Sequence, residues 1–378
     1  EKGHDVVVLT CSYSGQNEIK KGVIRIDDPG YNNNRTGIRW FKWFCRRILV
    51  ELKNIFGTYS SIFDRWLENI VRSHDLIRIE SSPDLIISTY PPVETLDAGI
   101  YLSKKFDIPL ITDFRDGLIY DPIERKNIEK FKSVRSFYEK MESDALKYSE
   151  NIISFSEPYT EYLKNKYKKD NVYTILNGYD EEDFASLPET ILLKKRKLNI
   201  VFTGRIEFSY KYNTIDPFIN AVRKIKENDK DLAYKIRFHF AGDLTTREKS
   251  SMNDLVSDGI FMLYGHVDRK DSLSIQRDAD ILLIFSQHDR PSAVPLKYFE
   301  YLYWKKPIIA LTKNNFLEEL MNLNRSGFCL NPEKEDEIYE FLSEYLSEPE
   351  KIFREYNPED NIKKYSIYEQ FKVLDKLI

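Results

Sequence analysis

The sequence predicts an α/β fold with two domains, each built on a parallel sheet, and three observations lead to this. The chain has 378 residues, which exceeds the usual size of one domain and allows two separate cores. Short apolar runs rich in branched side chains recur, such as 198–203 and 280–286, and they are typical of buried parallel strands. Longer amphipathic segments separate these runs, as the helices of βαβ units do.

Composition and charge exclude several classes of function. An apolar fraction of 42% and a charged fraction of 31% are those of a globular chain. A net charge of −4 gives no reason to expect nucleic acid as a partner. Three scattered cysteines and five histidines show neither a disulfide framework nor metal-ligand spacing, so we expect no metal and a reducing, cytoplasmic location. The sequence has no apolar run of about 18 residues that would span a membrane, and no visible signal peptide.

The first domain is expected to cover residues 1–183. Its first residues are typical of a helix end with Gly3 as the cap, followed by a buried strand that ends at Thr10. Further strands are expected at 22–27, 84–88, 108–113, 151–156 and 172–176, and helices at 38–56, 61–79, 93–106, 124–149 and 157–167.

The helix expected at 38–56 combines aromatic and cationic residues. Trp40, Phe44, Ile48 and Leu52 share one apolar face, and most of the cations flank it. One interpretation is contact with the headgroups of an anionic membrane. The alternative is an amphipathic helix packed on its own domain. The membrane interpretation would use Trp40, Phe41, Trp43, Phe44, Arg46 and Arg47.

Charged residues follow the strand expected at 108–113. They are Asp113, Arg115 and Asp116, and open α/β sheets bind ligands at the carboxyl ends of their strands. These three residues are candidates for acceptor binding or catalysis. The alternative is an Asp–Arg–Asp cluster that ties loops together.

A turn at Asn177-Gly178 leads out of the first domain, and we expect Gly178 to adopt a positive φ there. The polar stretch 184–197 is then the linker, 198–350 the second domain, and 351–378 a helical segment that returns to the first domain. Strands are expected at 198–205, 235–242, 259–265, 280–286 and 308–311, with closing helices at 334–346 and 366–377.

The stretch 290–310 carries the most specific pattern. Pro295 is suited to the first position of a helix, which would place Lys297 and Glu300 one turn apart. The amides of a helix N-terminus attract anions, and Glu300 has two oxygens for ribose hydroxyls. The alternative is a surface Lys–Glu pair worth ~0.2–0.5 kcal/mol.

This stretch resembles the nucleotide-binding segment of the retaining glycosyltransferases of family 4, through Val294, Pro295, Lys297, Glu300, Tyr301, Leu302, Lys306 and Pro307. The resemblance implies a GT-B fold, in which two Rossmann-like domains face a cleft. It also implies that a first strand and its loop precede Glu1, outside this chain, and that the phrases 88–92 and 113–116 lie on the acceptor side. The donor residues that it implies are Gly204, Arg205 and Lys211 for the pyrophosphate, His266 and Val267 beside the base, and Ser292, Ala293, Val294, Lys297 and Glu300.

One residue departs from the family pattern. The family often has two glutamates eight positions apart, and Ser292 stands where the first would hold sugar hydroxyls. Asp289 or the backbone of 292–294 is a candidate substitute.

The resemblance implies a metal-independent enzyme without a cofactor. It would move a sugar, most readily from a UDP-sugar, to a lipid-linked or surface-polysaccharide acceptor with retention of configuration. The expected location is the cytoplasm, with possible contact at the cytoplasmic face of the inner membrane of a bacterium. The alternatives are a GT-B-fold binding or scaffold protein without turnover, suggested by Ser292, and a nucleotide-sugar epimerase.

Overall fold

The computed structural model divides the chain into two compact units. The first comprises Glu1–Ile175 with Leu377–Ile378, and the second Leu176–Lys376. Residues 176–183, expected in the first domain, and almost all of 351–378 therefore belong to the second unit. The structure describes residues 3–12, 21–27, 37–122, 125–188, 193, 197–206, 215–286, 290–356, 358 and 362–378.

The strands of the first unit form two parallel sheets. The strands β1 and β2 pair with each other, and a four-stranded sheet has the order β3-β4-β5-β6. The strand bounds are β1 Val8–Ser12, β2 Val23–Asp27, β3 Ile86–Tyr90, β4 Leu110–Phe114, β5 Asn151–Ser154 and β6 Val172–Thr174. Val8 is half exposed, and Leu9, Thr10 and Cys11 are only half-buried, so the expectation that this strand is buried is wrong.

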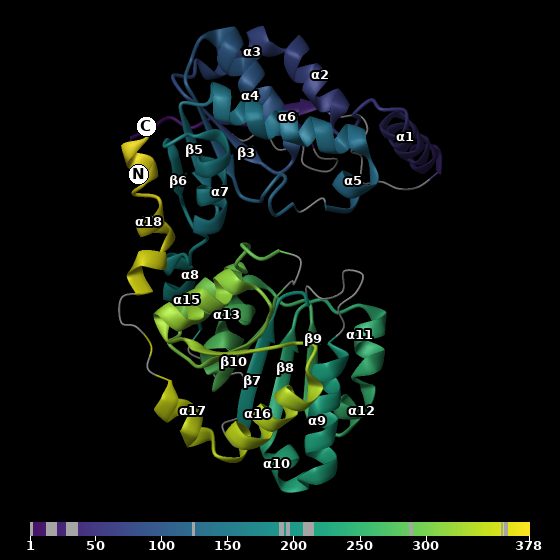
Figure 1. Ribbon diagram of the computed structural model, residues 1–378, viewed down its shortest axis with the longest axis vertical. Helices are drawn as coiled ribbons and strands as arrows, with labels where there is room; N and C mark the ends of the chain where they lie inside the picture. The colour runs from purple at the N-terminus through teal and green to yellow at the C-terminus, as the bar shows by residue number, and fades with distance from the viewer. Residues whose placement is uncertain are drawn as a thin grey trace. The chain divides into compact units, whose positions relative to one another are not determined.

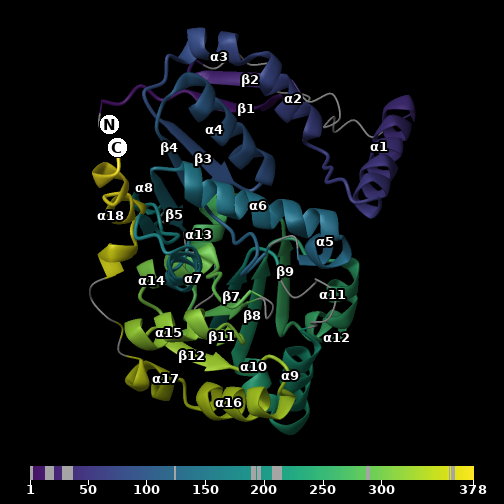
Figure 2. The ribbon, with the colours of Figure 1, turned by 45° about the horizontal axis from the view of Figure 1, so that its top comes forward.

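The helices of the first unit confirm most of the expected positions. Their bounds are α1 Gly37–Ile55, α2 Asp64–Arg72, α3 His74–Ser81, α4 Val93–Phe106, α5 Arg125–Lys130, α6 Lys132–Tyr148 and α7 Glu157–Tyr167. A core of Ile26, Trp66, Ile70, Ala98 and Leu102 joins β2, α2 and α4, which lie together in Figure 2.

Two of the helices expected in the first unit are broken. The segment 124–149 divides into α5 and α6 because Phe131 has an extended backbone, with φ −124° and ψ 118°. The segment 61–79 divides into α2 and α3 at Ser73. Helix α6 packs into the core of the unit through its buried residues Val134, Tyr138 and Met141.

The second unit contains a six-stranded parallel sheet of order β12-β11-β10-β7-β8-β9. Its strands are β7 Leu198–Thr203, β8 Ile236–Ala241, β9 Phe261–Gly265, β10 Ile281–Phe285, β11 Ile308–Leu311 and β12 Gly327–Leu330. Figure 1 shows β10, β7, β8 and β9 side by side, and Figure 2 also labels β11 and β12. Read along the chain, the order is that of a doubly wound dinucleotide-binding sheet, with β7 as its first strand.

Helices cover both faces of this sheet. Along β7, Ile200 and Phe202 point to one core, with α9, α10, α12 and α16, while Val201 points to the other, with α13, α14 and α15. The helix bounds are α8 Glu181–Ala185, α9 Asp216–Asn228, α10 Lys230–Lys235, α11 Thr246–Ser251, α12 Asn253–Ser257, α13 Arg269–Asp278, α14 Leu296–Tyr303, α15 Asn315–Asn324, α16 Glu335–Ser347, α17 Pro349–Glu355 and α18 Ile367–Gln370. Two short 3-10 helices lie at Ile362–Tyr365 and Leu374–Lys376, so the closing helix expected at 366–377 is interrupted.

Gly178 is required for a different reason from the one expected. Its φ is not positive. A Cβ at this position would instead lie 2.5 Å from the carbonyl oxygen of Tyr365, because the backbone at Tyr179 pairs with the segment at Ser366. The glycine therefore allows two distant backbone segments to approach each other.

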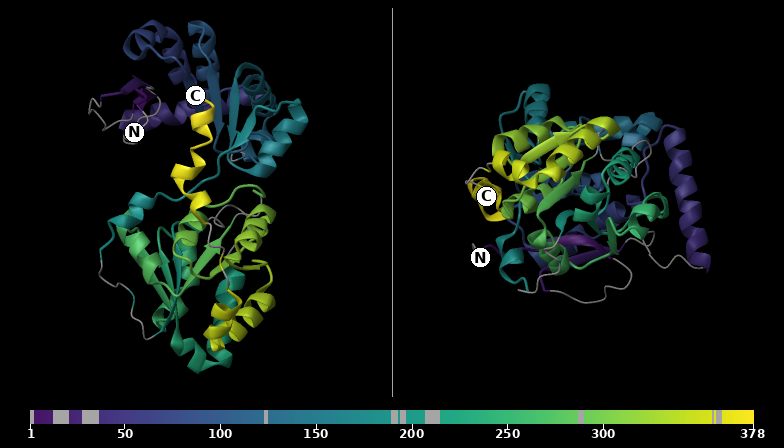
Figure 3. Two further views of the ribbon diagram at one scale, coloured as in Figure 1. Left: turned by 90° about the vertical axis from the view of Figure 1, so that its left-hand side faces the viewer. Right: turned by 90° about the horizontal axis from the view of Figure 1, so that it is seen from below.

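Helix α1 is attached to its unit through its polar side. The backbone carbonyl oxygen of Asn54 accepts a hydrogen bond at 2.7 Å from the hydroxyl of Ser133 on α6, and the side chain of Glu51 pairs with Lys130 on α5. The right-hand view of Figure 3 shows this helix at the margin of its unit. None of the helices that the structure describes is long and apolar enough to cross a membrane.

Candidate functional site

The second sheet has a topological switch point between β7 and β10. The chain runs from β7 to β8 and β9 on one side, and from β10 to β11 and β12 on the other. Ligands of doubly wound sheets bind outside the carboxyl ends of the strands at such a point. Gly204 and Arg205 follow β7 directly, and α14 follows β10, so the predicted donor residues on these segments meet at this edge.

Lys297 of α14 reaches back over the end of β7. Its ammonium lies 4.1 Å from the centre of the Phe202 ring and 3.5 Å from the carbonyl oxygen of Arg205. Gly204 has a φ of +93°, and a Cβ there would lie 3.3 Å from this ammonium. The glycine thus provides the space in which the cation lies against the backbone, and the structure brings Gly204, Arg205 and Lys297 together.

A second glycine shapes the same edge. Gly242, directly after β8, has a φ of +151°, and a Cβ there would lie 2.1 Å from the carbonyl oxygen of Gly204. Only a residue without a side chain permits this approach of the two strand ends. Sequence reasoning used this glycine as a strand end and missed its packing role.

The remaining predicted donor residues near β7 to β9 are more exposed. The guanidinium of Arg205 lies 3.7 Å from the carboxylate of Asp243, and His266 lies 3.9 Å from the same oxygen. Val267 is half-buried and packs against the core on one face of the sheet, and its predicted contact with a base stays a prediction. Lys211 and Asp289 lie outside the described residues.

The loop before α14 is held by a residue that the sequence did not indicate. Asn314 donates hydrogen bonds to the carbonyl oxygens of Arg290, at 3.0 Å, and Ala293, at 2.8 Å. Ser292 and Val294 are buried. The expectation that Pro295 is the first helical residue of α14 is wrong, because Pro295 is the N-cap and the helix begins at Leu296.

Glu300 is buried and belongs to a polar network. Its Oε1 accepts a hydrogen bond from Arg269 at 2.5 Å, and its Oε2 accepts one from Gln276 at 3.1 Å. Arg269 also contacts Asp183 at 2.8 Å. Glu300 is therefore not part of an ordinary surface pair, and it links α13 to α14. Its partners were missed because they lie 24 and 31 residues away in the sequence.

In the first unit, Asp113 and Arg115 contact each other at the end of β4. Asp113 Oδ2 accepts hydrogen bonds from Arg115 at 2.9 Å and from Thr89 at 3.3 Å. Arg115 also donates to the carbonyl oxygen of Ile175 at 3.3 Å, which favours the loop-tying alternative for this residue. Asp113 Oδ1 is buried and accepts no hydrogen bond from the described residues. Asp116 is half-buried on the following loop.

Burial raises the pKa of Asp113 above its usual value, and the positive charge of Arg115 opposes this shift. A buried carboxyl with one oxygen unused is suited to hydrogen bonding with a ligand hydroxyl. Asp113 is therefore the member of the predicted trio with the most suitable geometry for contact with an acceptor.

The apolar face of α1 is exposed. Its exposed residues include Phe41 at 60%, Leu49 at 58% and Ile55 at 58%, together with Phe44, Ile48 and Leu52. The alternative in which this face packs on its own domain is therefore wrong for the described residues. Trp43 and Arg47 lie elsewhere on the helix and line a cavity, while Arg46 is half-buried. The side chain of Trp40 lies outside the description.

The described residues contain no group of three or more His, Cys, Asp or Glu side chains placed to hold a metal ion. The expected independence of metal is not tested by this observation and stays a prediction.

Comparisons with known proteins agree with this architecture. Residues 197–348 match the family model described as Glycosyl transferases group 1. A comparison with curated proteins gave no match.

Several solved structures have a similar fold. A structure of trehalose-6-phosphate synthase aligns with a TM-score of 0.65 and 15% identity, over 98% of this chain and 92% of the other. Anabaena Alr3699/HepE in complex with UDP and glucose aligns with a TM-score of 0.58 and 13% identity, over 94% and 85%. The UDP-GlcNAc 2-epimerase of Neisseria meningitidis aligns with a TM-score of 0.57 and 14% identity, over 98% of both chains. The chain therefore has the GT-B fold and is a glycosyltransferase, with its group 1 glycosyltransferase domain at residues 197–348.

Proposed function

We propose that this enzyme transfers a sugar from a UDP-sugar to a lipid-linked or surface-polysaccharide acceptor, with retention of configuration and without a metal. The observation that carries the proposal is the position of Lys297, whose ammonium lies beside Gly204 at the switch point of the second sheet. A fixed cation at this edge is suited to a donor diphosphate. UDP is favoured because Anabaena HepE, which shares the fold, was solved with UDP and glucose.

The proposed reaction replaces one carbon–oxygen bond by another and transfers one proton. The oxygen of an acceptor hydroxyl bonds to the anomeric carbon, while the bond from that carbon to the β-phosphate oxygen breaks. The electron pair leaves with UDP, and the proton of the hydroxyl passes to the leaving phosphate on the same face of the sugar. Arg205, Lys211 and Lys297 would stabilise the negative charge that grows on the diphosphate.

Retention is proposed from the resemblance to family 4. The structural neighbour trehalose-6-phosphate synthase was studied for glycosyl transfer with retention, which supports the same proposal. Glu300 would bind the ribose through the remaining lone pairs of its oxygens while it holds Arg269. Asp113 would orient the acceptor through Oδ1.

We further propose that α1 binds an anionic membrane, which would bring a lipid-linked acceptor to the enzyme at the cytoplasmic face. The exposed face of this helix is apolar. Its sequence carries five cations, Arg39, Lys42, Arg46, Arg47 and Lys53, against the single acid Glu51, a net charge of 5 − 1 = +4 in a chain of net charge −4. Cations beside an apolar face complement the headgroups and acyl chains of such a surface.

The proposed enzyme activity is tested by a panel of UDP-, GDP- and dTDP-sugars in the presence of EDTA. We expect UDP to bind and the UDP-sugar to be consumed without added metal. In Glu300→Gln, which preserves the size of the buried side chain, UDP binding should weaken by about 1–2 kcal/mol, or roughly 5- to 30-fold. Absence of binding by every nucleotide would contradict the proposal, and loss of activity in EDTA would contradict metal independence.

The products separate this proposal from its alternatives. A nucleotide-sugar epimerase is a second candidate because the Neisseria meningitidis epimerase shares the fold along its whole length. An epimerase would convert the donor to its epimer without an acceptor, whereas a transferase releases UDP when an acceptor is added. A binding protein would bind UDP and do neither.

The membrane proposal is tested by sedimentation with vesicles. Vesicles that contain phosphatidylglycerol should bind the protein, and vesicles of phosphatidylcholine should bind it much less. Removing two inserted side chains in Phe41→Ser with Ile48→Ser should weaken binding at least roughly tenfold. The matched control changes two exposed apolar residues of the second unit, Tyr234→Ser with Leu323→Ser, and should bind like the unchanged protein. Equal binding by both double variants would refute the role of α1.

A further inference from the structure

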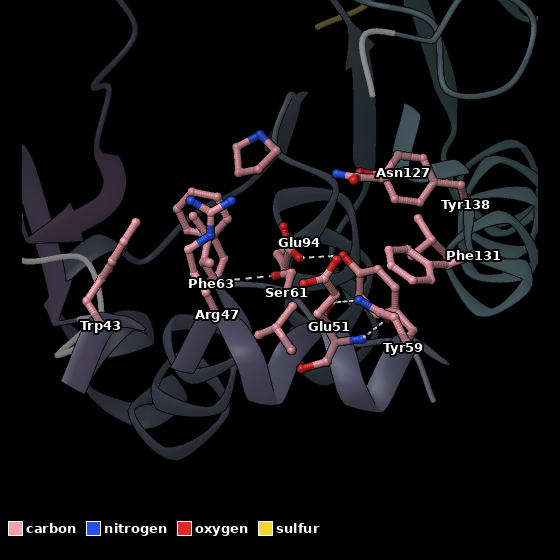
Figure 4. A pocket seen from close by; sticks show the side chains of 16 residues that line it. Trp43, Arg47, Glu51, Tyr59, Ser61, Phe63, Glu94, Asn127, Phe131 and Tyr138 are labelled. Atoms are coloured by element: carbon pink, nitrogen blue, oxygen red, sulfur yellow. Dashed lines mark hydrogen bonds between the residues drawn. The ribbon is translucent and has the colours of Figure 1, made fainter. Parts of the chain in front are cut away.

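The first unit contains a cavity of about 350 Å³ between the polar side of α1 and the start of α4 (Figure 4). Its walls include the aromatic side chains Trp43, Tyr59, Phe131 and Tyr138 and the polar side chains Arg47 and Glu94. The volume lies within the range of small-molecule sites. Aromatic, aliphatic and polar side chains share the lining, which suits a ligand that has both apolar faces and polar groups.

Glu94 is the most unusual residue of this cavity. It lies in the first turn of α4, is only 2% exposed, and accepts a hydrogen bond from the hydroxyl of Tyr59 at 2.6 Å. Buried carboxylates are normally paired with a cation, yet none of the ion pairs among the described residues includes Glu94. Burial raises its pKa, and hydrogen bonds from Ser61 and Tyr59 oppose this. The group therefore retains hydrogen-bonding capacity toward the cavity in either protonation state.

The aromatic walls are fixed by their neighbours. The ring of Tyr59 stacks on Phe137 at 3.7 Å with an angle of 4° between the planes, and it meets Tyr138 edge-on at 6.4 Å. The guanidinium of Arg47 lies 5.1 Å from the centre of the Trp43 ring. Rigid flat rings with a few polar groups complement a molecule that has apolar ring faces and hydroxyls at its edge, which describes a pyranose.

The cavity lies beside the predicted acceptor segment. Pro92, which forms part of the wall, follows β3, and Tyr90 at the end of β3 meets Tyr138 edge-on at 6.5 Å. Thr89 of the same strand donates a hydrogen bond to Asp113. The cavity and Asp113 are thus connected through the carboxyl ends of two neighbouring strands.

We propose that this cavity binds one pyranose ring of the glycan acceptor, with Glu94 hydrogen-bonded to its hydroxyls and the aromatic rings packed against its faces. The identification of the sugar as the acceptor rests on the proposed glycosyl transfer. The cavity as a pyranose site rests only on its own geometry.

The probes are methyl glycosides of glucose, galactose, mannose and N-acetylglucosamine, observed by saturation-transfer-difference NMR on the whole chain. At least one should bind with millimolar affinity. Glu94→Gln should weaken this binding roughly tenfold, because hydrogen bonds to a carboxylate are stronger than those to an amide. Glu68→Gln, at an exposed position on α2, is the matched control and should leave binding unchanged. UDP binding is measured on the same samples.

Trp43→Leu provides a second variant in case Glu94→Gln does not fold, which thermal unfolding would show. It removes one aromatic wall and should also weaken glycoside binding. The inference is overturned if no glycoside binds, or if a folded Glu94→Gln or Trp43→Leu protein binds the glycoside as tightly as the unchanged protein. If glycosides bind in this way and UDP does not, the pyranose site stands and the proposed donor chemistry fails. If UDP-sugar turnover is observed and no glycoside binds, the proposed donor chemistry stands and the pyranose site fails.

Discussion

Replacing Lys297 by methionine tests the donor site most directly. Methionine keeps the length of the side chain and its packing over Phe202 but removes the charge. The lost interaction with the ring is a partly exposed cation–π contact at 4.1 Å, worth about 0.5–1 kcal/mol of folding stability. If the ammonium binds a donor phosphate, the variant also loses a charge-assisted hydrogen bond, worth about 1.5–3 kcal/mol.

These two magnitudes give separate readouts. A loss of about 1.5–3 kcal/mol in transition-state stabilisation lowers kcat/KM for the UDP-sugar by roughly 10- to 150-fold. The same variant should lose no more than about 1 kcal/mol in the free energy of unfolding, measured in urea. A large kinetic effect with a small stability effect is the expected signature of a ligand contact.

The matched control is Lys334→Met, since Lys334 is exposed and pairs with Glu337 on α16, away from the switch point. This variant should change neither kcat/KM nor the free energy of unfolding appreciably, because exposed ion pairs contribute little to stability. A decrease of less than about threefold in kcat/KM for Lys297→Met, with the protein folded, would show that Lys297 does not contact the donor.

Three further predictions concern the fold that supports the site. Gly242→Ala should lower the free energy of unfolding in urea by at least about 2 kcal/mol, because its Cβ would meet a carbonyl oxygen at 2.1 Å. Gly265→Ala, also at positive φ but with open space around it, should cost about 1 kcal/mol. Equal losses in the two variants would refute the steric argument. Burial lowers the pKa of His239 to about 4 from its usual 6.5, so the unfolded chain takes up a proton first as the pH falls. The free energy of unfolding should therefore drop by about 2 kcal/mol between pH 7 and pH 5. His239→Gln should remove that part of the pH dependence. Glu142→Gln should destabilise the first unit by about 2–3 kcal/mol, because Glu142 is a fully buried acceptor for three tyrosines and a lysine. Glu139→Gln, at an exposed position of the same helix, should have little effect. Comparable unfolding midpoints for the two variants would contradict this prediction.

The positions of most strands could be predicted from the sequence with errors of a few residues, but β12 was not predicted. The run at 308–311 became β11 without change, and the run at 280–286 became β10, because continuous branched apolar residues have few other stable conformations than a buried strand. Helix ends were predicted less well. The break at Phe131 has no proline or glycine beside it and depends on packing, which a local pattern does not contain.

The candidate donor site was only partly visible in the sequence. Lys297 and Gly204 are 93 residues apart, and the resemblance alone suggested that they act together. The partners of Glu300 were not predicted, because Arg269 and Gln276 are brought to it by the packing of α13 on α14. A motif indicates which residues matter, but it does not show which of them are already occupied by other side chains.

The sequence by itself determined the α/β class, the positions of most strands along the chain and the amphipathic character of α1, because these depend on periodicity within short segments. Only the tertiary structure decided which side of α1 is covered. Periodicity places Phe41, Ile48 and Leu52 on one side of the helix. Whether this side is buried or exposed depends on the opposite side, where Asn54 and Glu51 contact residues 79 positions away in the sequence. Those contacts hold the polar side against α5 and α6 and leave the apolar side exposed, and Asn54 and Glu51 also form part of the wall of the cavity beside Glu94.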